Sequence, residues 1–288
     1  MLKMDNVVAI DRSPKPFKSG ESRTRVISVT SGKGGVGKSN IVVNMAMAFR
    51  KVGHRVLILD GDFGLSNIDI LFNIPVNGNV EEVLREGKPI RDIISRGPLG
   101  IDLIPSCSGL MDASELDAND RTRLITAMEE LDFEYDILLI DTGAGIHSDV
   151  LWLNSTANEV IVVTTPEPTA ITDAYALIKV LHQKHRVKRV KLIVNQVKDS
   201  AEGLKVYNRI SDVTDRFLNV GIDYLGHVPW DGCMTEAVRM REPLLSSFPA
   251  SQAALQIGKV ARSLVESSRK SEVTGGAQFF WQSLVGNV

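Results

Sequence analysis

The segment from Gly32 to Ser39 carries the residue types that bind a phosphate chain. Its order, Gly-Lys-Gly-Gly-Val-Gly-Lys-Ser, satisfies the pattern G-x-x-x-x-G-K-[ST]. Glycines let a backbone wrap closely around a polyphosphate with its N–H groups pointing inward. We expect Lys38 to reach the β- and γ-phosphates and the hydroxyl of Ser39 to ligate Mg²⁺ directly. The segment therefore predicts a nucleoside-triphosphate site.

The sequence on either side supplies the elements that such a loop needs. Residues 25–30 alternate and are rich in β-branched side chains, which predicts a strand, and apolar residues at helical spacing follow from Ile41. A helix that begins at the loop adds the positive end of its dipole to the phosphate site. The predicted nucleotide contacts in this loop are Gly32, Lys33, Gly34, Gly35, Val36, Gly37, Lys38, Ser39 and Asn40.

Carboxylates follow two further apolar runs. Asp60 and Asp62 come directly after residues 56–59, and Asp141 ends the run 137–140. Mg²⁺ takes oxygen ligands and usually keeps several waters. An apolar strand that delivers an aspartate to the magnesium is the Walker B arrangement. We expect Asp60, Asp62 and Asp141 to act on the metal through water, with Gly143 to Gly145 as a mobile switch beside the γ-phosphate.

Composition limits the class of protein. The chain has 288 residues, 43% hydrophobic content and a formal net charge of −2, so nothing in the overall balance requires a nucleic-acid partner. The first apolar run, residues 7–10, is too short for a secretory signal, and no run approaches the roughly 18 apolar residues of a membrane span. Cys107 and Cys233 form no C-x-x-C pair. These features indicate a cytoplasmic protein.

Strand-like and helix-like segments alternate along most of the chain. Apolar runs at 56–59, 101–105, 137–140, 160–164, 190–194 and 222–228 are separated by helical patterns at 41–52, 80–85, 114–131, 169–182, 201–218 and 251–266. This alternation predicts an α/β fold with a doubly wound, mostly parallel sheet flanked by helices. We expect a leader at 1–24, one ATPase domain at 25–267, and a linker with a C-terminal helix at 268–288.

A second lysine inside the loop, Lys33, narrows the family. The sequence Gly32-Lys33-Gly34-Gly35 resembles the deviant Walker A motif of the MinD/ParA family of P-loop ATPases. The resemblance implies that ATP is bound with Mg²⁺ and hydrolysed slowly, and that Lys33 crosses a homodimer interface to the partner's nucleotide. It also implies that Asp62 positions the attacking water, with Asp60 behind it. Catalysis would then rest on Asp62, Lys33 and Lys38.

The same resemblance predicts contacts to the nucleoside. It places Asn195 at the adenine edge, Pro229 and Asp231 beside the ring, and Glu167 on the ribose bound to the partner subunit. Simple turn chemistry is the alternative for Asn195, Pro229 and Asp231, because asparagine, proline and aspartate also favour turns that follow strands.

Three features resemble the FlhG/FleN group of flagellar regulators within that family. They are Asn40 after the phosphate loop, the run from Glu167 to Lys179, and residues 213–218 together with Phe279-Phe280-Trp281. The group implies as partners an FlhF-type GTPase, flagellar C-ring proteins and a flagellar transcription activator. Residues 1–24 contain no D-Q-A-x-x-L-R motif. Stimulation of the GTPase is therefore not implied, whereas association with it is.

The C-terminal residues predict a short amphipathic helix. At 100° per residue the side chains of Phe280, Trp281, Leu284, Val285 and Val288 fall within an arc of roughly 140°. Such a helix binds a membrane interface weakly, so two in a dimer would gain by avidity. Docking on the parent domain is the alternative. The predicted membrane contacts are Phe279, Phe280, Trp281, Leu284 and Val285.

These observations favour an ATP-dependent dimerising switch that reaches an anionic membrane as a dimer and is reset by hydrolysis. A ParA-like module that binds nonspecific DNA is the alternative from another class, supported by the basic residues between Lys184 and Lys191. A solvated loop explains these residues more simply, so we expect no DNA partner. The spacing of Cys107 and Cys233 disfavours an iron–sulfur carrier.

Overall fold

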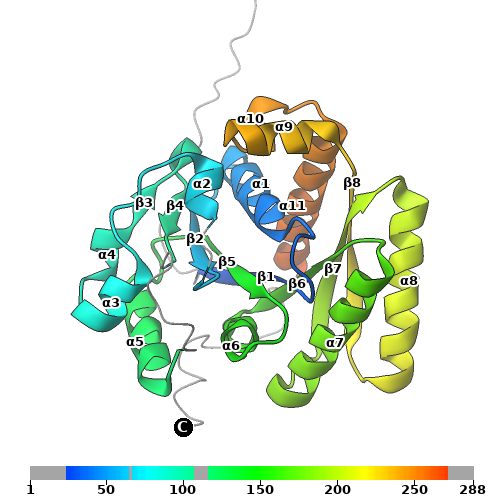
Figure 1. Cartoon of the computed structure of the whole chain (residues 1–288), viewed down its shortest axis with the longest axis horizontal. Helices are drawn as coiled ribbons and strands as arrows, with labels where there is room; N and C mark the ends of the chain where they lie inside the picture. The colour runs from blue at the N-terminus through cyan, green and yellow to red at the C-terminus, as the bar shows by residue number, and fades with distance from the viewer. Residues whose placement is uncertain (1–23, 65–66, 107–115, 272–288) are drawn as a thin grey trace, which may run out of the picture.

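A computed structural model of the chain describes residues 24–64, 67–106 and 116–271. The described residues form an eight-stranded sheet in the order β3-β4-β2-β5-β1-β6-β7-β8, in which every neighbouring pair is parallel except β3 and β4 (Figure 1). The strands are β1 (Arg25–Ser31), β2 (Val56–Gly61), β3 (Ser95–Arg96), β4 (Asp102–Ile104), β5 (Ile137–Ala144), β6 (Glu159–Thr164), β7 (Arg189–Val197) and β8 (Gly221–Pro229). The expected α/β fold is confirmed.

Helices cover both faces of the sheet. Those longer than one turn are α1 (Lys38–Lys51), α2 (Ile68–Phe72), α3 (Val80–Glu86), α5 (Ala118–Glu129), α6 (Ser148–Thr156), α7 (Pro168–His185), α8 (Ser200–Phe217), α9 (Gly232–Met240) and α11 (Gln252–Ser271). The single turns are α4 (Ile90–Ile93), α10 (Leu244–Ser247) and the 3₁₀ turn η1 (Pro98–Gly100). Alternate strand residues serve opposite faces: Leu139 packs with α1 and α11, whereas Leu138 packs with α3 and α5. The central strands are therefore buried on both sides, as their continuous apolar sequences require.

The sequence patterns missed some elements. Helix α6 has no polar face over its middle, since residues 150–153 are all buried, so it shows no helical alternation of apolar and polar residues. No helix was predicted over the residues of α9. Helix α11 continues to Ser271, four residues beyond the domain end expected at 267. Several predicted features lie outside the described residues. They are the leader up to residue 23, Cys107, and the tail from residue 272 with its predicted membrane contacts Phe279, Phe280, Trp281, Leu284 and Val285.

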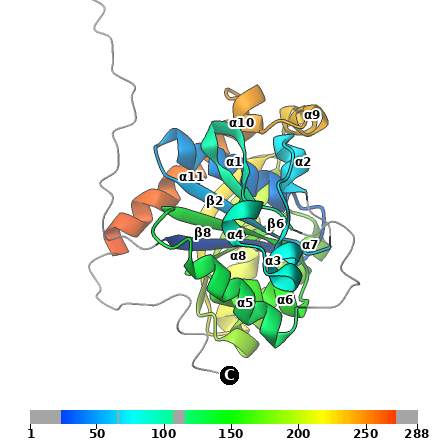
Figure 2. The ribbon, with the colours of Figure 1, turned by 90° about the vertical axis from the view of Figure 1, so that its left-hand side faces the viewer.

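The carboxyl ends of the parallel strands lie together at one end of the sheet. Because β1, β2, β5, β6, β7 and β8 run parallel, their carboxyl ends meet at one edge, where ligands bind in such folds. Figure 2 shows α2 and α9 toward one side and the last turns of α11 toward the other. Among the described helices, none has both the length and the hydropathy needed to cross a membrane.

Candidate functional site

The phosphate loop joins β1 to α1 at the carboxyl edge of the sheet. Gly35 and Gly37 adopt positive φ angles of 79° and 86°, which other residues adopt at a cost. Gly37 precedes the first turn of α1, and no side chain caps that turn. The N–H groups at the start of α1 are therefore available to a bound anion, and the helix dipole favours negative charge there.

Gly32 is required for a different reason, the close approach of a neighbouring helix. A Cβ atom added to it would lie 2.2 Å from the backbone carbonyl carbon and oxygen of Asp173 in α7. Glycine at this position lets α7 pack directly against the phosphate loop. The loop is thus positioned by a helix from a distant part of the sequence.

Lys38 lies in the floor of the loop and pairs with Asp141. Its ammonium donates to Oδ1 of Asp141 at 2.5 Å, and the two residues are 8% and 1% exposed. Burial raises the pKa of Asp141, against the lowering effects of the Lys38 charge and of hydrogen bonds from Lys38 and Ser39. The structure therefore brings the predicted phosphate-binding lysine, Ser39 and the Walker B aspartate into direct contact.

The two carboxylates after β2 have separate environments. Asp60 is 1% exposed and accepts the backbone N–H groups of Asp62, Asn67 and Ile68 at 3.2, 3.2 and 3.3 Å. It lies beside Asp141 in the register of β2 and β5. Asp60 thus holds the loop that presents Asp62, and its predicted action on magnesium through water stays a prediction.

Asp62 lies beside the expected switch. The Asp62 carboxylate is 3.5 Å from the position that a Cβ of Gly143 would occupy, and Ser106 donates its hydroxyl to the Asp62 carbonyl at 2.9 Å. The structure thus brings Asp62 next to Gly143, and the predicted role of Asp62 in positioning a water stays a prediction.

Lys33 faces outward from the loop. Its ammonium donates to Glu167 at 2.6 Å and to the hydroxyl of Thr169 at 2.9 Å. The Lys33 and Glu167 side chains are 35% and 55% exposed, and the hydrogen bond from Lys33 lowers the pKa of Glu167. The sequence did not predict this contact within one chain. A contact of Glu167 with a partner's ribose stays a prediction.

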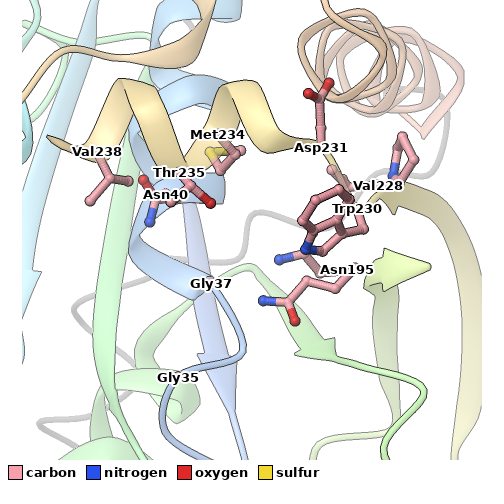
Figure 3. Close-up of a pocket in the computed structure, with 12 residues that line it drawn as sticks. Gly35, Gly37, Asn40, Asn195, Val228, Trp230, Asp231, Met234, Thr235 and Val238 are labelled. Atoms are coloured by element: carbon pink, nitrogen blue, oxygen red, sulfur yellow. The ribbon is translucent and has the colours of Figure 1, made fainter. Parts of the chain in front are cut away.

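A pocket of about 260 Å³ opens beside the phosphate loop (Figure 3). It is lined by Gly35, Gly37, Asn40, Asn195, Gln196, Val228, Pro229, Trp230, Asp231, Met234, Thr235 and Val238. A mostly apolar pocket with a few polar groups suits a nucleobase. The structure thus gathers Asn195, Pro229 and Asp231, as expected, next to the loop.

Asn195 and Asp231 also carry structural contacts. The side-chain amide of Asn195 donates to the Val36 carbonyl at 2.8 Å, so it braces the phosphate loop. Asp231 accepts N–H groups from Cys233 at 2.9 Å and Ala253 at 3.1 Å, and so caps α9 and ties down α11. Figure 3 shows its carboxylate pointing toward these helices. Their predicted roles at the adenine stay predictions.

Sequence reasoning missed one prominent pocket residue. Trp230 is 70% exposed although it lines the pocket. A large aromatic side chain directly after a strand, at the edge of the sheet where ligands bind, was the available signal. Within the described residues, no group of three or more His, Cys, Asp or Glu side chains could hold a metal ion. A hydroxyl, carboxylates acting through water and a nucleotide's phosphates are the donor set that Mg²⁺ accepts.

The sequence is similar to a family model and to known proteins. A family model described as an AAA domain matches residues 24–194. The antiactivator FleN of Pseudomonas aeruginosa is 36% identical over 261 residues, which cover 91% of this chain and 93% of FleN. The flagellum site-determining protein YlxH of Helicobacter pylori is 33% identical over 264 residues, which cover 91% of this chain and 89% of YlxH.

The fold also matches a solved structure. The septum site-determining protein MinD of Pyrococcus horikoshii, complexed with Mg-ADP, superposes with a TM-score of 0.69 at 24% identity, over 85% of this chain and 97% of its own. At this identity the likeness supports the fold alone.

Proposed function

The chain belongs to the family of P-loop ATPases that contains FleN, YlxH and MinD, and we propose that it acts as an ATP-dependent dimerisation switch in the control of flagellar number and placement. Family membership makes it an ATP hydrolase that uses ATP and Mg²⁺. The flagellar role is supported by the printed functions of FleN and YlxH.

The residues of the site divide the chemistry between them. Lys38 and the N–H groups at the start of α1 would hold the phosphates, and Ser39 would hold the metal ion, which when bound would supply positive charge to the phosphoryl group. Asp62 orients the attacking water. Asp141 pairs with Lys38 and would support the water shell of the metal.

The observation that best supports the proposed dimerisation switch is the exposed position of Lys33. A phosphate loop with a buried Lys38 already has its cradle charge, so Lys33 is not needed in its own site. Its present partners are exposed, and an exposed ion pair contributes little to stability because solvent screens the two charges. Lys33 can therefore leave Glu167 at low cost and enter the site of a second subunit, where a cation stabilises the transition state as an arginine finger does.

The proposed switch acts through the C-terminal tail and through partner proteins. We propose that the ATP-bound dimer presents two C-terminal helices to an anionic membrane and that hydrolysis returns the monomer. An FlhF-type GTPase, C-ring proteins and a flagellar transcription activator are the proposed partners. A DNA-partitioning role has no additional support from the described residues.

Sedimentation velocity in ATP and in ADP tests the switch, with vesicle pelleting in parallel. We expect a dimer in ATP and a monomer in ADP. Asp62→Ala should make the ATP dimer persist, because bound ATP is no longer hydrolysed. Lys33→Ala should bind ATP but stay monomeric, whereas Lys51→Ala, a matched change at the far end of α1, should behave as wild type.

Two results would overturn parts of the proposal. A Lys33→Ala protein that still dimerises in ATP contradicts the role of Lys33. A wild-type dimer that pellets with anionic vesicles equally well after truncation at Gly276 contradicts the membrane role of the tail.

A further inference from the structure

A cavity of about 280 Å³ lies at the amino ends of β2, β4 and β5, away from the nucleotide site. Val56 and Asp102 begin β2 and β4, and Tyr135 comes two residues before β5. The volume is close to that of the pocket beside the phosphate loop, so the cavity has space for a phosphate group with a small organic part. The charged and aromatic residues that line it are Arg50, Arg55, Arg96, Asp102, Glu134 and Tyr135.

Helix α1 separates this cavity from the phosphate loop. Lys38 begins α1 at the loop, and Arg50 lies in its last turn. A rise of 1.5 Å per residue places the two ends of this 14-residue helix about 20 Å apart. A nucleotide bound at the loop, with its base in the pocket at the ends of β7 and β8, therefore does not reach the cavity.

Arg50 is fixed in place while part of its guanidinium stays unused. Its Nε donates to the Leu99 carbonyl at 3.0 Å, and its Nη1 donates to the His54 carbonyl at 2.8 Å. Among the described residues, Nη2 of Arg50 makes no hydrogen bond and no carboxylate pairs with this side chain. The two backbone contacts thus orient a cation that has no anion of its own.

Arg96 brings another guanidinium to the same place. Its Nη1 donates to both carboxylate oxygens of Asp102, at 2.7 and 2.9 Å. A Cβ added to Gly100 would lie 3.0 Å from Nη2 of Arg96 and 3.4 Å from Nη2 of Arg50. The two Nη2 atoms therefore converge beside Gly100, where a glycine with a φ of 75° leaves space open. Like charges repel at this separation, and an anion bound beside both removes the repulsion.

The carboxylates around the cavity already have cations of their own. Their ion pairs are Asp102 with Arg96, Glu134 with Arg91, and Asp136 with Arg55. Asp102 also accepts the Tyr135 hydroxyl at 2.9 Å, and burial raises the pKa of Tyr135, so this hydroxyl keeps its proton. The charge of Arg50 is therefore in excess at this cavity.

A purely structural role explains only part of this arrangement. The helix dipole favours a cation in the last turn of α1, which accounts for Arg50 alone. It does not account for the cavity or for the approach of Arg96. Guanidinium groups present paired N–H donors that match phosphate oxygens, and a phosphate monoester carries a charge of about −1.5 to −2 at pH 7. Two guanidinium groups at one point suit this charge better than that of a single carboxylate.

We infer that this cavity binds a small phosphorylated molecule, with its phosphate group held by Arg50 and Arg96 beside Gly100. The site lies in the ATPase domain at the end of α1 opposite the phosphate loop. It goes beyond the proposed switch and does not depend on dimerisation.

Isothermal titration calorimetry of the full chain with inorganic phosphate tests the site. The nucleotide site is first filled with one equivalent of a non-hydrolysable ATP analogue and Mg²⁺, and the ionic strength is held constant. Arg50→Gln and Arg96→Gln should each weaken phosphate binding on the order of 10-fold, because each removes a charge-assisted hydrogen bond. Arg50→Lys keeps the charge but loses the paired donors, so its affinity should be intermediate.

Arg189→Gln is the matched control. Arg189 pairs with Asp223 and its side chain is 72% exposed, close to the 70% of Arg96, but it does not line the cavity. This variant should bind phosphate as wild type does. Thermal unfolding of every variant shows whether it is folded.

Glu134→Gln gives a test of opposite sign. It removes a negative charge from the lining while leaving an oxygen that accepts from Arg91, so phosphate should bind several-fold more tightly. A residue that only supports the fold would not produce this gain.

Two results would overturn the inference. One is a wild-type protein that binds no phosphate once its nucleotide site is filled. The other is phosphate binding of equal strength in wild type, Arg50→Gln and Glu134→Gln, which would place the anion elsewhere.

Discussion

Two lysines of one loop show how environment decides what a residue does. Lys38 is buried against Asp141, whereas Lys33, five positions earlier, lies on the surface between Glu167 and Thr169. A buried charge pair is held tightly because either partner alone would be costly, whereas an exposed pair exchanges readily. The buried lysine suits a permanent role in its own site and the exposed lysine suits a role in another subunit.

Trp230 and Asp231 are neighbours with different expected effects on nucleotide binding. Trp230→Ala should weaken ATP binding by about 1–3 kcal/mol, the contribution of stacking between an aromatic side chain and a base, and should leave thermal stability unchanged because the indole is 70% exposed. Fluorescence titration with a labelled nucleotide measures this effect. Unchanged affinity in Trp230→Ala would place the base elsewhere.

Asp231→Ala serves as the comparison. This change removes the acceptor for the Cys233 and Ala253 N–H groups, so it should lower the free energy of unfolding by about 1–2 kcal/mol. Its effect on ATP affinity should be smaller than that of Trp230→Ala.

Glu159 makes stability depend on pH. Burial raises the pKa of Glu159, but the hydrogen bonds and charges of Arg25 and Lys191 lower it by more than burial raises it. The pKa of Glu159 therefore lies below its ordinary value of 4.5. A carboxylate with a depressed folded-state pKa contributes stability above its unfolded pKa and loses that contribution as the pH falls through its folded pKa.

The wild type should therefore be more stable than Glu159→Gln at neutral pH, and the difference in free energy of unfolding should shrink below about pH 4.5. Urea unfolding of both proteins across the acid range measures it. A difference that stays constant down to the acid transition would show that the ion pairs do not set the pKa.

At the scale of elements, the phosphate loop depends on α7 as well as on β1 and α1. Gly32→Ala should force the loop away from the Asp173 carbonyl, which would cost about 1–3 kcal/mol of stability and weaken nucleotide binding. Gly258→Ala in α11 is the control, since a Cβ there would meet no heavy atom within 4 Å outside its chain neighbours and its own helix. Thermal unfolding and nucleotide titration compare the two. Equal effects of both changes would contradict this packing argument.

The elements also show what the sequence could and could not predict. Continuous apolar strands such as residues 137–140 and the glycine pattern at 32–39 predicted the parallel sheet and the phosphate loop, because both signals are local. Helix α6 was missed because burial on all sides removes its polar face. The braces that Asn195 and Asp231 provide were not predictable, since their partners Val36 and Ala253 are set by tertiary packing.

Across the whole molecule, the sheet separates two working edges. The phosphate loop and the pocket beside it lie at the carboxyl ends of the parallel strands, whereas Leu264 of α11 contacts Arg25 at the start of β1, toward the other end of the sheet. In the proposed switch, dimerisation at the nucleotide site joins two chains, and each chain contributes one C-terminal tail to the membrane attachment. Avidity then converts a modest change in assembly into a large change in membrane affinity.

The central claim is that Lys33 completes the site of a second subunit, and mixing two inactive variants tests it most directly. Lys33→Ala keeps its own Asp62, and Asp62→Ala keeps a Lys33 that can reach its partner. A mixed dimer has one complete site, that of the Lys33→Ala subunit, which keeps its own Asp62 and receives Lys33 from its Asp62→Ala partner. We predict that the mixture hydrolyses ATP faster than the sum of the two variants alone; mixed dimers that form without any recovered hydrolysis would contradict the account.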